Sequence, residues 1–160
     1  MALNNFSWVI PGKLAGSDLP GACGSTDDLR EDIAFMASEG VKVLVSLARP
    51  AAPLAKVCAE AGMEWRCFPI PDFGVPSDYG PFGGLVDDCI EFISAGRGVC
   101  IHCHAGIGRT GMVLSCIVGV YFNLDAQNAV DAVRAVRHAV ETREQCLFIN
   151  GFLKSRNYES

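Results

Sequence analysis

The sequence predicts a single α/β domain in which helices flank a central, mostly parallel sheet. Short apolar segments alternate along the chain with segments whose apolar residues recur at helical spacing, an order typical of α/β sandwiches. Glycine and proline mark the segment boundaries throughout, without a repeat, a charge block or a linker. A chain of 160 residues, 50% of them hydrophobic, is long enough for one buried core. We therefore expect residues 1–160 to form one domain.

The expected elements follow one another with short connections. In chain order they are an apolar start at 8–10, a helix at 25–39, a strand at 41–47, a helix at 53–61, a strand at 64–70, a loop at 71–81, a helix at 85–93, a strand at 99–102, and helices at 109–122, 125–137 and 142–154. Gly40 and Gly62 end the first two helices, and Asp125 caps a later one. The loop is rich in proline and glycine, which suit neither a helix nor a strand ladder. The helix at 109–122 is apolar on most sides, so we expect it at the centre of the fold.

The composition excludes several classes of function. A net charge of -5 and a pI near 5.1 give no general attraction to nucleic acid or to an anionic membrane. The N-terminal segment MALNNFSWVIPGK lacks the basic stretch and long apolar run of a leader, and no stretch of the sequence approaches the roughly 20 apolar residues of a membrane helix. We expect a cytoplasmic protein without stable membrane association, in which any bound anion is held by a local arrangement.

The cysteines are expected to be reduced and mostly buried. All eight occur in a chain without a secretion signal, most of them inside apolar strand or helix patterns. No paired C-x-x-C spacing suggests a zinc site. We therefore expect neither a metal nor another cofactor.

One segment, GVCIHCHAGIGRTGM at residues 98–112, carries the strongest chemical signal. It places Cys103 at the carboxyl end of a buried strand, before a glycine-containing turn and a helix, where ligands bind in open α/β sheets. A turn this short can direct successive amide N–H groups inward as a nest for an anion, with the positive end of the helix behind them. Arg109 can add a bidentate guanidinium, and Thr110 can donate its hydroxyl to a Cys103 thiolate. The residues expected to cradle a phosphate or a similar oxyanion are His104, Ala105, Gly106, Ile107, Gly108 and Arg109.

Asp72 in the loop IPDFGVP is the candidate proton donor. A carboxylic acid on a flexible loop beside a phosphate pocket can protonate a leaving oxygen. Taken alone, Asp72 would read as a turn residue after a proline. Its combination with the cysteine segment favours catalysis.

These residues resemble the protein tyrosine phosphatase superfamily, and in particular its small atypical dual-specificity phosphatases. HCHAGIGRTG matches the signature H-C-x-x-G-x-x-R followed by Ser or Thr at every fixed position. The segments NFSWVIPGKLAGSDLP, VLVSLARP, IPDFGVPS and VETREQ are most similar to the dual-specificity phosphatase 23 group. The resemblance implies a metal-free, two-step hydrolysis of phosphotyrosine in proteins or peptides through a phosphocysteine. Phosphoserine and phosphothreonine are further candidate substrates, and the depth of the pocket decides how well they compete.

The resemblance also implies individual roles. Cys103 would be the nucleophile, Arg109 the phosphate binder, Asp72 the general acid and then base, and Thr110 the residue that stabilises the thiolate. Glu141 and Gln145 match a segment that orients water in relatives. Relatives usually carry Arg-Pro-Gly just before that segment, whereas this chain has Arg, His and Ala at residues 137–139. The alternative to a catalytic role is therefore that Glu141 is a carboxylate at a helix N-terminus and Gln145 a solvated amide.

Four further interpretations concern the substrate, the class of protein and the redox chemistry of the site. His104 and Ile107 stand where lipid-phosphate phosphatases tend to carry lysines, which disfavours inositol phosphates without excluding them. A module that only binds phosphoproteins would lack one of the catalytic residues, and none is missing here. A rhodanese-type sulfur transferase also uses a cysteine loop, but it would not need Asp72. Cys67 is the first candidate for a disulfide that protects an oxidised Cys103, against the simpler interpretation of a small core residue.

Overall fold

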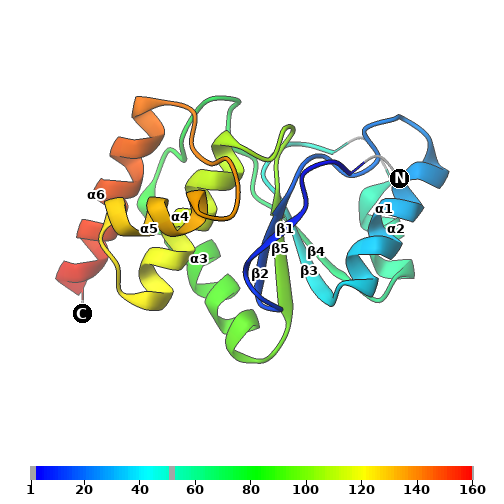
Figure 1. Ribbon diagram of the computed structural model, residues 1–160, viewed down its shortest axis with the longest axis horizontal. Coiled ribbons are helices and arrows are strands. Elements are labelled where there is room, and N and C mark those ends of the chain that lie inside the picture. The colour runs from blue at the N-terminus through cyan, green and yellow to red at the C-terminus, as the bar shows by residue number, and fades with distance from the viewer. Residues whose placement is uncertain (1–2, 51–52, 160) are drawn as a thin grey trace.

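The computed structural model describes residues 3–50 and 53–159. Its elements in chain order (Figure 1) are β1 (Ser7–Ile10), β2 (Leu14–Ser17), α1 (Thr26–Ser38), β3 (Val41–Ser46), α2 (Leu54–Glu60), β4 (Glu64–Cys67), α3 (Tyr79–Ser94), β5 (Gly98–His102), α4 (Gly108–Phe122), α5 (Ala126–Arg134) and α6 (Arg143–Glu159).

The sheet has five strands in the order β1-β2-β5-β3-β4, with β5 in the middle. Strand β1 is antiparallel to β2, and the three other pairings are parallel. The expected α/β fold with a central, mostly parallel sheet is therefore confirmed. Strand β2 was missed because its sequence, LAGS, lacks the β-branched residues that favour strands. A Cβ on Gly16 would approach Leu114 and Arg137 to within 2.9 Å, so small residues let β2 pack closely.

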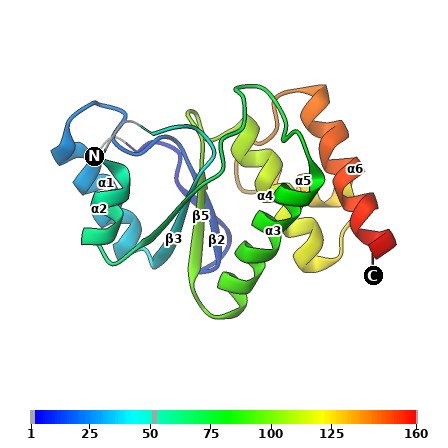
Figure 2. The ribbon, with the colours of Figure 1, turned by 180° about the vertical axis from the view of Figure 1, so that it is seen from behind.

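Helices cover both faces of the sheet. Helices α1 and α2 lie on one face and α3 to α6 on the other, and the view from behind in Figure 2 shows the same layers. Alternate residues of each strand enter the two cores: Val43 and Val45 pack on the α3–α6 side, whereas Leu44 and Cys100 pack on the α1–α2 side. Helix α4 is buried along most of its length, as its apolar sequence predicts.

Two expected boundaries around the loop at 71–81 are wrong. Strand β4 ends at Cys67 rather than at residue 70, and α3 begins at Tyr79, inside the expected loop. Asp78 starts α3 by accepting a hydrogen bond from the Gly80 amide at 2.9 Å. Pro81 is tolerated because amides of the first helical turn need no partner within the helix.

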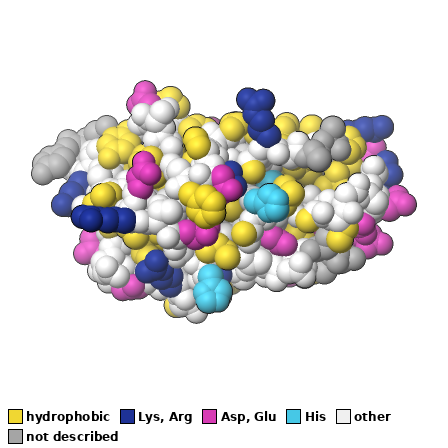
Figure 3. Space-filling view, turned by 90° about the horizontal axis from the view of Figure 1, so that it is seen from above, with side chains coloured by type: hydrophobic (Ala, Val, Ile, Leu, Met, Phe, Trp, Pro, Cys, Tyr) yellow, Lys and Arg dark blue, Asp and Glu magenta, His cyan; other side chains and the backbone are white. Residues whose placement is uncertain are grey.

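The carboxyl ends of the parallel strands meet at one edge of the sheet, at the top of Figure 1. Figure 3 looks onto this edge and shows acidic, basic and apolar side chains interspersed, without a field of one sign. A bound anion must therefore be held by local groups. Among the described residues, no helix is long and apolar enough to cross a membrane.

Candidate active site

The loop between β5 and α4 turns its carbonyl groups outward. Each carbonyl from residue 103 to residue 107 accepts a hydrogen bond from a group outside the loop's own turn. The donors are His102 Nδ1 to Cys103 O (2.9 Å), Leu19 N to His104 O (2.9 Å), Asn5 Nδ2 to Ala105 O (3.1 Å), Arg137 Nη2 to Gly106 O (2.8 Å), and the amides of Gly111 (2.9 Å) and Val140 (3.1 Å) to Ile107 O.

Because a trans peptide points its N–H opposite to its C=O, this arrangement directs the amides of residues 104–108 toward the interior of the loop. No acceptor among the described residues takes a hydrogen bond from the amides of residues 104–109. Gly106 has φ +78°, and a Cβ there would lie 2.6 Å from the Ser17 carbonyl oxygen. Only glycine fits this turn. The free amides and the N-terminus of α4 together form an anion-binding nest.

Cys103 lies at the start of this nest. Its side chain is buried, with 3% exposure, and the Thr110 hydroxyl donates a hydrogen bond to its Sγ at 3.0 Å. Thr110 is held in the first turn of the buried helix α4. The predicted pairing of this hydroxyl with the thiol is therefore present in the structure.

His102 supports the loop from behind through an ordered chain of hydrogen bonds. Burial lowers the pKa of His102 to about 4, so the imidazole is neutral near pH 7. A carbonyl oxygen can only accept, so Nδ1 carries the proton that bonds Cys103 O. Nε2 then accepts from the Ser46 hydroxyl at 2.5 Å, and Ser46 Oγ accepts from Trp65 Nε1 at 2.8 Å. The chain fixes the histidine tautomer and the direction of the Cys103 carbonyl.

The structure brings Asp72 to Arg109, as the predicted site requires. Arg109 is buried, and its Nη2 lies 3.1 Å from Asp72 Oδ1 while Nη1 donates to the Ile70 carbonyl at 3.0 Å. The Asp72 side chain keeps 66% exposure. The next residue, Phe73, has φ +59° and an exposed ring, an uncommon conformation for an aromatic residue. A strained, exposed loop thus presents Asp72 beside the guanidinium.

Glu141 and Gln145 also lie at the site. A Cβ built on Gly108 would collide with the Glu141 carboxylate and lie 3.2 Å from Gln145 Nε2. Gln145 is buried, and its Oε1 accepts from the Glu141 amide at 2.9 Å. Its Nε2 faces the Gly74 carbonyl at 3.4 Å, which links α6 to the Asp72 loop. The alternative of a solvated amide is therefore wrong for Gln145.

Sequence reasoning missed Arg137 as part of the site. This buried guanidinium donates to the carbonyls of Asn5, Gly16 and Gly106 and to the Ser7 hydroxyl, at 2.6 to 3.0 Å. Burial lowers the pKa of Arg137, yet an arginine keeps its charge near pH 7. Arg137 thus joins the N-terminal segment to the loop. The only signal in the sequence was its place where relatives carry Arg-Pro-Gly.

The proposed disulfide partner Cys67 is placed wrongly for that role. In the sheet, Ser46 of β3 lies between Cys67 of β4 and His102 of β5. Strands β4 and β5 are therefore separated by two strand spacings, or roughly 10 Å. A disulfide needs Cα atoms within about 7 Å of each other. Cys67 also lies on the α1–α2 side of the sheet, whereas Cys103 packs on the other side. The geometry contradicts the pairing.

Among the described residues, no group of three or more His, Cys, Asp or Glu side chains could hold a metal ion. The chemistry available at this edge comes from the thiol, the amide nest, the guanidinium and the carboxylates. This set, on this fold, is that of a cysteine-based phosphatase.

Comparison with known proteins agrees. The family model described as "Polymorphic toxin system, DSP-PTPase phosphatase" matches residues 15–121, and the chain belongs to this family of dual-specificity and tyrosine phosphatases. Mouse protein tyrosine phosphatase domain-containing protein 1 is 29% identical over 132 residues, covering 71% of this chain and 17% of that protein. Rat cyclin-dependent kinase inhibitor 3 is 32% identical over 95 residues, covering 57% of this chain and 44% of the relative. The chain thus spans less than half of either protein.

Solved structures extend the likeness over nearly the whole chain. Tk-PTP in its active form has a TM-score of 0.81 and 26% identity, covering 95% of this chain and 97% of that one. PTPMT1 in complex with PI(5)P has the same TM-score at 17% identity, covering 98% and 99%, and shows the shared fold. The chain therefore has the fold of the protein tyrosine and dual-specificity phosphatases, with Cys103 in the loop between strand and helix.

Proposed function

We propose that the protein hydrolyses phosphotyrosine in proteins or peptides through a phosphocysteine on Cys103, with phosphoserine and phosphothreonine as further candidate substrates. The observation that carries the proposal is the set of outward carbonyls at residues 103–107, because it leaves a ring of inward amides beside a buried thiol. Such a nest suits a phosphate dianion and a thiolate alike.

In the first step, Cys103 Sγ attacks phosphorus and the bond to the ester oxygen breaks. Arg109 and the loop amides hold the three peripheral oxygens as charge moves across them. Asp72 gives its proton to the leaving oxygen. In the substrate-free structure Asp72 pairs with Arg109 at 3.1 Å, so phosphate would take over the guanidinium and free the carboxyl group.

In the second step, water attacks phosphorus and the P–S bond breaks. Asp72 accepts the proton of the water, and the hydroxyl of Thr110 stabilises the departing thiolate. Glu141 and Gln145 orient the water, a role supported by their contact with Gly108 and by the link from Gln145 to Gly74. No metal or other cofactor takes part in this scheme.

We further propose that residues 1–160 act as a single domain of the small atypical type, similar to the dual-specificity phosphatase 23 group, in the cytoplasm. The quoted segments from the N-terminus to VETREQ support the grouping. The substrate class rests on two loop positions that carry no lysine. His104 is exposed and Ile107 is partly buried where a lipid-phosphate enzyme would gain from lysine side chains.

The test compares wild type and Cys103→Ser on an aryl phosphate, a phosphopeptide panel and inositol phosphates. We expect wild type to turn over the aryl phosphate and the phosphopeptides. Cys103→Ser should keep binding while losing turnover to below about one per cent, because its hydroxyl is a poor nucleophile. Retained turnover would refute the mechanism, and a preference for inositol phosphates would refute the substrate class.

A further inference from the structure

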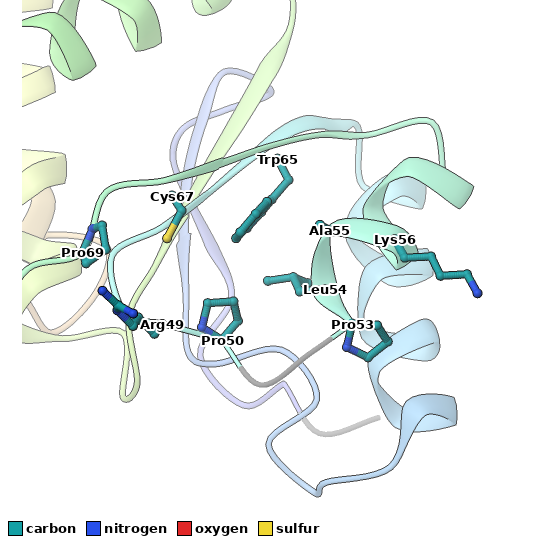
Figure 4. A pocket seen from close by; sticks show the side chains of 9 residues that line it. All are labelled: Arg49, Pro50, Pro53, Leu54, Ala55, Lys56, Trp65, Cys67 and Pro69. Atoms are coloured by element: carbon teal, nitrogen blue, oxygen red, sulfur yellow. The ribbon is translucent and has the colours of Figure 1, made fainter.

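A large cavity lies outside the catalytic loop. It has a volume of about 730 Å³ and lies between the segment after β3, the start of α2 and the end of β4. Figure 4 shows Trp65, Leu54 and Pro50 around its centre, with Arg49, Cys67 and Pro69 toward one end. We call this cavity, lined by these six residues and neighbouring ones of α2, the Trp65 groove. Neither Cys103 nor Arg109 lines it.

The groove opens at the same edge of the sheet as the catalytic loop. Ser46, at the end of β3, pairs with His102, so the segments that continue to Arg49 and to Cys103 leave the sheet side by side. At the other wall, Pro69 precedes Ile70, whose carbonyl accepts from Arg109 at 3.0 Å. The strands β5 and β4 are roughly 10 Å apart, a span of about three residues of extended peptide. A peptide whose phosphorylated residue enters the nest can therefore reach the groove.

The walls of the groove combine apolar surface with positive charge. Leu54 is buried and Trp65 and Pro50 are half-buried, whereas Arg49 is exposed. Two basic side chains, Arg49 and Lys56, and no acidic one line the groove among the described residues. The charge of Arg49 is felt inside the groove. Partial burial raises the pKa of the Cys67 thiol, and the positive charge of Arg49 opposes that rise. In a chain of net charge -5, this is a local basic and apolar site.

Trp65 is a fixed wall rather than an adaptable one. Its Nε1 donates to Ser46 Oγ at 2.8 Å, which holds the ring in one orientation. A wall that is already ordered costs little conformational entropy when an apolar side chain packs against it.

We propose that the Trp65 groove binds a segment of the phosphoprotein substrate about three residues from the phosphorylated residue, through a large apolar side chain and an adjacent acidic one. The apolar side chain packs between Trp65, Leu54 and Pro50, and the acidic one pairs with Arg49. The proposal rests on the phosphopeptide activity proposed above, and it assigns the specificity of that activity to a surface outside the nest.

The test uses phosphotyrosyl peptides with Leu-Glu or Ser-Gly placed three residues before or after the phosphotyrosine. We expect kcat/KM to be about tenfold higher for a Leu-Glu peptide on one of the two sides, since an anchored apolar group and an ion pair together contribute about 1.4 kcal/mol or more. Arg49→Glu should reduce this preference to about twofold or less, because it replaces attraction by repulsion. Cys67→Phe, which fills the groove from an exposed position, should do the same.

Lys42→Glu is the matched control, because Lys42 is exposed near the opposite, amino-terminal end of β3. It makes the same charge change and should leave the preference intact. Turnover of an aryl phosphate, which cannot reach the groove, should stay within about twofold of wild type in all three variants.

Equal kcat/KM for Leu-Glu and Ser-Gly peptides, or equal losses in Arg49→Glu and Lys42→Glu, would overturn the proposal. If Cys67→Phe does not fold, the peptide preference of Arg49→Glu still tests the proposal, because Arg49 is exposed. Wild type that hydrolyses no aryl phosphate would instead refute the proposed function, so the two failures are distinct.

Discussion

Acid should destabilise the protein through His102. The pKa of this buried imidazole is about 4, compared with 6.5 for an unperturbed histidine. The unfolded chain therefore binds the proton more readily between these two values, and the free energy of unfolding falls as pH falls through that window. The stability due to the neutral ring is fully present above pH 6.5. Between about pH 7 and about pH 4.5, His102 alone should reduce the free energy of unfolding by about 2 kcal/mol.

Urea unfolding at a series of pH values measures this loss. The variant His102→Asn removes the titration, so its stability should fall with acid by about 2 kcal/mol less than that of wild type. His138→Asn is the matched control, because His138 is exposed, and it should follow wild type. Parallel pH dependence in wild type and His102→Asn would refute the buried, neutral histidine, and with it the ordered chain from Trp65 to the Cys103 carbonyl.

Three further substitutions test separate parts of the site. Asp72→Asn should lower kcat by about 10² to 10⁴ for a phosphotyrosyl peptide but much less for an activated aryl phosphate, whose leaving group needs no proton. An equal loss of kcat for both substrates would show that Asp72 is not the general acid, and Asp78 would be the next candidate. Thr110→Val removes the 3.0 Å hydrogen bond to Cys103 Sγ and should slow phosphoenzyme breakdown, measured by burst kinetics, by about 10- to 100-fold. Thr110→Ser keeps a hydroxyl and should largely retain the wild-type rate of breakdown. Similar rates in the two variants would show that the hydroxyl does not stabilise the thiolate. Arg109→Lys should lower kcat/KM by at least about tenfold because lysine lacks the bidentate fork, and near-normal kinetics would show that Arg109 does not bind phosphate.

The catalytic loop was predictable because its chemistry is local in sequence. Cys103, Gly106 and Thr110 fall within one strand-turn-helix unit, so their spacing fixes their relative positions. The hydrogen bond from Thr110 to Cys103 and the positive φ of Gly106 both follow from that unit. Asp72 could be placed as well, because it begins a loop at the same edge of the sheet.

Contacts between distant segments could not be predicted in the same way. Arg137 reaches Gly106 and Gly16 because α5 packs on α4 beside β2, and β2 itself has no strand signal in its sequence. The hydrogen bond of Trp65 to Ser46 depends on the register between β3 and β4, which the sequence leaves open. Strand order is equally open in the sequence. Cys67 was expected near Cys103 because its strand leads into the Asp72 loop, but β3 lies between β4 and β5.

The phosphocysteine itself is the central claim, and rapid acid quenching tests it directly. Wild type is mixed with excess aryl phosphate, quenched during the first turnover, digested and mapped by mass spectrometry. We predict one added phosphoryl group on the peptide that contains Cys103, formed in a burst and absent from Cys103→Ser. A phosphoryl group on another residue, or turnover in which Cys103 is never modified, would contradict the mechanism.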